Sequence, residues 1–65
     1  MKILLKDILL KKNLTYRQAE ILTNVSKSAL QAIANERRDP RLSTLEQIAA
    51  GLKVKISDLF ESEYK

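Results

Sequence analysis

Short and amide-bearing side chains recur at helical spacing between Lys27 and Asn35. Leu30 and Ile33 mark the side of this segment that is expected to be buried. Glutamine and lysine can reach base edges in the major groove of DNA, and small side chains permit a close approach. The residues on the opposite side whose types fit this chemistry are Lys27, Ser28, Gln31 and Ala32. The same pattern also fits a plain helical hairpin with a polar outer face.

Basic residues cluster directly after this segment. Arg37 and Arg38 follow it, and Arg41 stands just after Pro40, the only proline. Arginines beside a helix that reads bases can hold phosphates, although a charge cluster of this kind is often only solvated. Twelve Lys and Arg against eight Asp and Glu give a net charge of +4, which is compatible with a nucleic-acid partner.

Helical spacing predicts five short helices that position these side chains, over about residues 3–12, 15–23, 26–35, 43–52 and 57–63. Local signals mark their ends. Thr15 with Gln18 and Ser43 with Glu46 fit capping boxes, and Ser26 fits a single N-cap. Asn13 and Asn24 suit left-handed turns, and Ser57-Asp58 suits the start of the last helix. The turn over residues 24–26 is short enough for a helix-turn-helix.

Length and composition restrict the class of protein. A chain of 65 residues allows one domain, here residues 1–65. The helical spacing along this domain predicts an all-α fold. The chain contains no Cys and no His, which excludes disulfides and the usual zinc sites. No glycine-rich phosphate loop or carboxylate cluster is present, so we expect no enzyme, no cofactor, no metal and no small-molecule ligand. No apolar run approaches the ~20 residues of a membrane span. We therefore expect a soluble, cytoplasmic protein.

Three segments are informative jointly because of their order and spacing: LTYRQAEILTNVSKSAL, AIANERRDP and STLEQIAAGLKVKISDLF. They contain a Leu-Thr entry to the second helix, a Val-Ser turn, a loop of Asn, basic residues and Pro, and a final Asp-x-Leu-Phe. With these pieces, residues 5–60 resemble the Cro/C1-type helix-turn-helix family, also called the XRE family, to which the phage λ and 434 repressors belong.

The resemblance implies a compact five-helix, lambda-repressor-like domain that binds operator DNA, usually as a two-fold dimer, with the helix-turn-helix in helices 2 and 3. Transferred position by position, Lys27, Ser28, Gln31 and Ala32 fall where the family reads bases. The positions that fall among DNA backbone contacts are Tyr16, Ser26, Asn35, Arg37, Arg38 and, in the minor groove of some relatives, Arg41.

Several positions depart from the family pattern. The family favours Gly at turns where this chain has Asn13, Asn24, Glu36 and Lys53. Glu suits a left-handed turn poorly, so the loop at Glu36 is expected to be strained or differently shaped. Many relatives bury an Arg–Glu pair where this chain has Leu9 and Ala34, and we expect these two to be buried together. Gly51, inside the fourth helix, predicts close packing of a neighbour.

Two functions compete at this stage. The first is a sequence-specific regulator, expected to be a repressor that binds a palindromic operator as a homodimer in a bacterial or phage-encoded, nucleoid-associated setting. Because the chain stops at Lys65, dimerisation would use the same domain, either through the loop before the fourth helix or through the C-terminal residues Val54, Ile56, Leu59 and Phe60. The alternative is an antitoxin-like or adaptor module whose main partner is another protein, which the apolar first helix favours.

Overall fold

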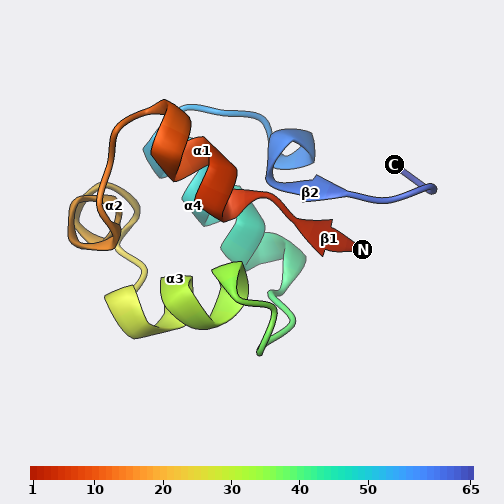
Figure 1. The fold of residues 1–65 in the computed structure, drawn as a ribbon, viewed down its shortest axis with the longest axis horizontal. Coiled ribbons are helices and arrows are strands. Elements are labelled where there is room, and N and C mark those ends of the chain that lie inside the picture. Colours follow the sequence, from red (N-terminus) through yellow and green to blue (C-terminus); the bar gives the residue numbers. More distant parts are fainter.

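The computed structural model describes residues 1–65 as four α-helices, one 3-10 helix and a two-stranded sheet (Figure 1). The elements are β1 (Lys2–Ile3), α1 (Leu5–Lys11), α2 (Tyr16–Thr23), α3 (Lys27–Ala34), α4 (Leu42–Leu52), η1 (Ile56–Leu59) and β2 (Phe60–Glu61). None of the helices is long and apolar enough to cross a membrane.

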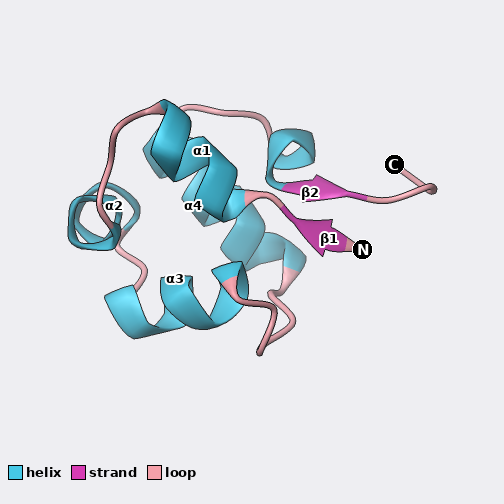
Figure 2. Cartoon of the chain, in the orientation of Figure 1, coloured by secondary structure: helices cyan, strands magenta, loops and turns pink.

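The expected five-helix, all-α architecture is wrong at both ends of the chain. The predicted fifth helix over 57–63 is the 3-10 turn η1 followed by strand β2, and the first helix begins at Leu5 rather than at Ile3. Strand β1 pairs antiparallel with β2, with Ile3 opposite Phe60, so the two termini lie at one end of the molecule (Figure 2). The backbone N–H of Leu4 donates to Leu59 O at 2.8 Å. The segments near the two termini therefore pair with each other, and this pairing satisfies their backbone N–H and C=O groups without another helical turn.

The second predicted capping box is also wrong. Helix α4 begins at Leu42, and its N-cap is Arg41, which makes no side-chain capping bond. Arg41 is already extended (φ −71°, ψ 154°) just after Pro40, and its carbonyl accepts from the N–H of Leu45. Ser43 therefore lies inside the first turn. At the start of η1 the cap is Lys55, whose N–H donates to the carboxylate of Asp58 at 3.0 Å, rather than Ser57.

The caps around α2 and α3 are confirmed. Thr15 Oγ1 accepts from the N–H of Gln18, and Gln18 Oε1 accepts from the N–H of Thr15, at 3.1 and 2.8 Å. Ser26 Oγ accepts from the N–H of Ala29 at 3.2 Å. These hydroxyls and amides satisfy N–H groups that a helix start leaves without partners, so both helices begin where the sequence predicts.

A single core is shared by all the helices. Its largest fully buried side chains are Leu5, Leu30, Ile33, Ile48 and Leu59. Leu9 belongs to this core with 4% of its surface exposed, and Ala34 is half-buried and packs against the same core. Two apolar residues thus occupy the positions where relatives are expected to bury opposite charges. No unpartnered polar side-chain atom is buried anywhere in the chain.

Gly51 is a point of close contact between α4 and the end of α2. A Cβ at this position would lie 2.6 Å from the carbonyl oxygen of Leu22 and 2.7 Å from Cα of Thr23. Both neighbours are backbone atoms, so neither can rotate away. The expected close packing at Gly51 is confirmed, and it fixes the end of α2 against α4.

Candidate nucleic-acid interface

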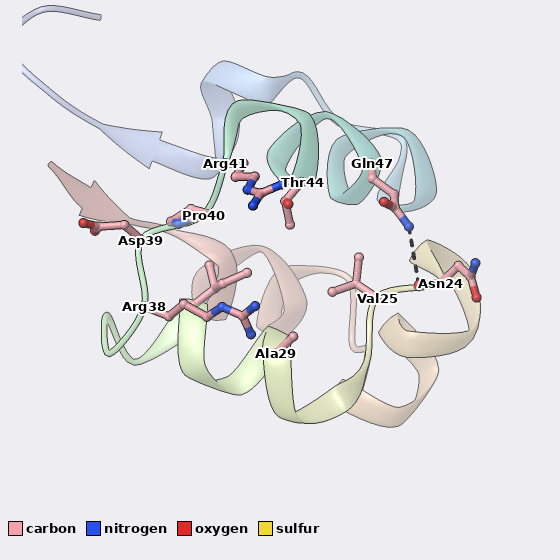
Figure 3. A pocket seen from close by; sticks show the side chains of 10 residues that line it. Asn24, Val25, Ala29, Arg38, Asp39, Pro40, Arg41, Thr44 and Gln47 are labelled. Carbon is pink, nitrogen blue, oxygen red and sulfur yellow. Dashed lines mark hydrogen bonds between the residues drawn. The ribbon is translucent and has the colours of Figure 1, made fainter.

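The turn between α2 and α3 is held by side chains from both sides. Asn24 adopts the predicted left-handed conformation (φ 60°), and the buried Thr23 donates from Oγ1 to Ala19 O at 2.7 Å while accepting from the N–H of Val25 at 3.2 Å. Gln47 of α4 reaches across and donates from Nε2 to Thr23 O at 2.9 Å and to Asn24 O at 3.4 Å. Figure 3 shows the second of these bonds. The two helices of the motif are therefore fixed relative to each other and to α4.

Helix α3 presents the face that the sequence predicts. Leu30 and Ile33 are buried, whereas Lys27 and Ser28 are exposed and Gln31 is half-buried. The one ion pair of the molecule joins Lys65 to Glu61, so Lys27 is unpaired. Ser28 Oγ lies 3.4 Å from the capping hydroxyl of Ser26. Neither Lys27 nor Gln31 bonds through its side chain to the rest of the chain, and both can therefore donate to an external partner.

Ala32 and Tyr16 are both less exposed than Lys27 and Ser28. Ala32 is half-buried, so little of it projects beyond the helix. Tyr16 is the first residue of α2, and its half-buried ring packs against the core. Its position beside the capped start of α2 leaves the polar end of the side chain as the part that can reach a partner.

The basic residues surround a groove between α3 and the start of α4. Figure 3 shows Arg38 extending from the loop along the α3 wall toward Ala29, while Arg41 lies beside Thr44 on the opposite wall. Asp39 also lines the groove, but its side chain points outward in this view. Arg37 and Asn35 are exposed at the end of α3. The groove thus has one guanidinium group on each wall, and these charges suit it to an anion.

The C-terminal residues expected in a dimer interface are only partly at the surface. Val54, Ile56 and Phe60 are half-buried and pack against the core, whereas Leu59 has 1% of its surface exposed. Leu59 can therefore support an interface from beneath but contributes almost no area to it.

Sequence reasoning missed several residues. Gln47 is exposed on α4 and carries no sequence signal for its bond to the turn, because its partners lie 24 and 23 residues away. Leu22 and Leu42 are exposed apolar side chains, and Ile21 has 76% of its surface exposed. Their helical spacing alone does not distinguish them from core residues.

Comparison with known proteins identifies one family. The family model described as helix-turn-helix matches residues 5–59, from the first residue of α1 to the last residue of η1. No curated protein and no solved structure matches the chain. Strands β1 and β2 lie outside the matched range.

Proposed function

The chain belongs to the helix-turn-helix family of the Cro/C1 type, and on this premise we propose that it is a sequence-specific DNA-binding transcription regulator in which α3 enters the major groove. The observation that carries the proposal is the combination of an unpaired polar face on α3 with two guanidinium groups in the adjacent groove. A recognition helix needs the first for base edges and the second for phosphates.

The proposed contacts divide into two kinds. Lys27, Ser28, Gln31 and Ala32 contact base edges, and Gln31 is the side chain best suited to bidentate recognition of adenine. Phosphates are held by residues at the two ends of α3, in the loop that follows it and at the start of α2: Tyr16, Ser26, Asn35, Arg37, Arg38 and Arg41. Ser26 already uses its hydroxyl as a cap, so its contact would add to that bond.

We further propose that the protein acts as a repressor that binds a palindromic operator as a homodimer. Two copies related by a two-fold axis would place their α3 helices about 34 Å apart, one turn of DNA. The interface proposed is the C-terminal region with Val54, Ile56 and Phe60 above the buried Leu59. Sedimentation that finds only monomer, both alone and with saturating operator, would contradict this assembly.

A protein-binding module is the second candidate. The observation that favours it is the pair of exposed apolar residues Ile21 and Leu22 on α2, together with Leu10 on α1. Exposed apolar side chains suit a protein contact better than a DNA contact, which is more polar and more charged.

Selection of bound sites from random duplex DNA tests the proposed function first. The expected result is a palindrome, whose half-sites give both the operator and the symmetry of the dimer. Recovery of no enriched sequence, together with no binding to any duplex, would favour the protein-binding module.

Two variants then separate base contacts from phosphate contacts. Gln31→Ala is expected to cost about 1–3 kcal/mol of discrimination at one base pair per half-site with little change in the salt dependence of binding. Arg38→Ala is expected to weaken operator and scrambled DNA equally and to flatten the salt dependence, because it removes a phosphate contact. Lys12→Ala, at the C-cap of α1 and outside the proposed contacts, removes the same charge as a control. Equal loss on both duplexes for Gln31→Ala would show that this face does not read bases.

A further inference from the structure

The C-terminus of α3 ends on a residue type that its conformation disfavours. Glu36 is left-handed (φ 58°), its N–H donates to Ile33 O at 3.0 Å, and the N–H of Arg37 donates to Ala32 O at 2.9 Å. This pattern of bonds is the Schellman motif, in which the left-handed position is usually Gly. At Glu36 the chain therefore departs from the family pattern in residue type only. The backbone adopts the left-handed conformation that a glycine would adopt there.

A second helix ends in the same way and provides a reference. Lys53 closes α4 with φ 59°, and the N–H of Val54 donates to Ala49 O at 3.0 Å. Both residues carry a Cβ in a region of φ that favours glycine. Both residues are exposed, but the side chain of Lys53 makes no hydrogen bond, whereas that of Glu36 makes a long-range bond.

Glu36 Oε1 accepts from the backbone N–H of Ile3 at 3.0 Å, across 33 residues of sequence. The direction of that N–H follows from the sheet. Successive N–H groups of a strand point alternately toward and away from the partner, and Leu4 donates to Leu59 O, so the N–H of Ile3 points away from β2. The carboxylate thus joins the end of α3 to a strand that lies outside the residues matched by the family.

The loop that this bond holds has few other constraints. Arg37 and Arg38 follow Glu36 directly, and no residue from Arg38 to Pro40 donates a backbone hydrogen bond. Between the end of α3 and the start of α4 at Leu42, the loop is therefore fixed at its two ends only. At the end where the arginines begin, the bond from Glu36 to Ile3 adds a long-range connection to the two backbone bonds that close α3.

We propose that Glu36 is a positioning residue for the DNA-binding loop: its carboxylate, held by the N–H of Ile3, fixes Arg37 and Arg38 beside α3 so that they meet phosphates without first having to be ordered. This inference rests on the proposed function. An ordered arginine loses less conformational freedom on binding than a mobile one, so the tether strengthens binding although Glu36 itself carries a negative charge near the phosphates.

Replacing Glu36 removes a negative charge as well as a hydrogen bond, so two variants are needed to separate these effects. Glu36→Gln and Glu36→Gly both remove the negative charge, but only the glutamine keeps an oxygen that can accept from Ile3. Lys53→Gly is the matched control, since it relieves the same left-handed strain in a helix end that has no tether. Thermal melts of all three establish that each variant is folded.

Hydrogen exchange of the backbone amides tests the tether without DNA. The amide of Ile3 is expected to exchange at similar rates in the wild-type protein and in Glu36→Gln, and markedly faster in Glu36→Gly. Lys53→Gly should leave it unchanged. Equal exchange at Ile3 in the wild type and in Glu36→Gly would overturn the tether itself.

Titration with duplex DNA tests its role. Glu36→Gly is expected to bind about threefold to tenfold more weakly than Glu36→Gln, by the same factor on operator and scrambled sequences, because the loop contacts phosphates only. Lys53→Gly should bind as the wild type does. If the two Glu36 variants bind equally although Ile3 exchange differs, the tether does not position the arginines. If wild-type protein binds no duplex, the proposed function and the positioning role fall together, while the exchange result still decides whether the bond exists.

Discussion

The helix-turn-helix unit and the terminal sheet of this protein are stabilised by bonds of very different range. Around α2 and α3 most side-chain bonds join residues two to four positions apart, such as Thr15 to Gln18 and Ser26 to Ala29. The exception is Gln47, which bonds to the turn from more than twenty residues away. At the other end, Ile3 bonds to Glu36 and Leu4 bonds to Leu59. The first region can form its turns locally, whereas the second can form only after the chain has folded and brought distant residues together.

The two regions share one core, so a substitution that disrupts this core should unfold both regions together. Leu9→Arg would place an unpaired charge among buried side chains and is expected to cost about 3–5 kcal/mol, which is enough to unfold a domain of this size. Chemical denaturation measures the loss, and sheet and helix signals should disappear together.

The neighbouring residue supplies the control for this substitution. Leu10 has 71% of its surface exposed, against 4% for Leu9, so Leu10→Arg should change the stability by about 0.5 kcal/mol or less. Adding Ala34→Glu to Leu9→Arg should recover part of the loss if the two side chains meet. Equal effects of arginine at Leu9 and Leu10 would place Leu9 outside the core.

Gly51→Ala should affect the helix-turn-helix unit more than the sheet. Its Cβ would collide with the backbone of Leu22 and Thr23, so we expect a loss of about 1–3 kcal/mol although alanine favours helix over glycine by about 1 kcal/mol. Thermal denaturation and amide exchange in α2 measure the effect. Ala50→Gly, at the adjacent exposed position of α4, should cost only the difference in helix propensity. A stabilised Gly51→Ala protein would mean that α2 can shift at no cost.

The smallest expected effect is confined to one helix end. Thr15→Ala removes the hydroxyl that accepts from the N–H of Gln18, and with it the capping box. The substitution should reduce the stability by about 1 kcal/mol and speed amide exchange at the start of α2. The amide of Ile3 in the sheet should be unaffected. Ser43→Ala is the control, because Ser43 lies inside α4 and caps nothing. A comparable loss of stability for Ser43→Ala would show that Ser43 stabilises the helix start in some other way.

The same difference in range explains which elements could be predicted from the sequence. The caps at Thr15 and Ser26 and the left-handed turn at Asn24 depend on residues close to them, and all three were predicted correctly. The strand at Ile3 was read as helix because its apolar spacing continues that of α1. Nothing near Ile3 in the sequence indicates that Phe60 will pair with it.

The candidate site likewise contains features that could be predicted from nearby residues and features that depend on distant ones. The exposed face of α3 follows from helical spacing and was predicted, including the burial of Leu30 and Ile33. The roles of Gln31 and Arg38 came from the family resemblance and stay predictions until DNA is bound. The contributions of Gln47 and Glu36 could not be foreseen, because each bonds to a backbone group more than twenty residues away.

The bond between Glu36 and Ile3 also decides how the sheet can grow. A strand at the edge of a sheet offers free backbone groups to other chains, and a sheet with two such edges can add copies without end, as fibres do. Here the carboxylate occupies the N–H that β1 would offer to an added strand, while no strand covers the outer side of β2. A sheet with one available edge can accept a single copy and is then complete, as in a closed two-fold assembly. The carboxylate at the end of α3 therefore satisfies the N–H group through which β1 could pair with another strand, which disfavours the addition of a strand at that edge.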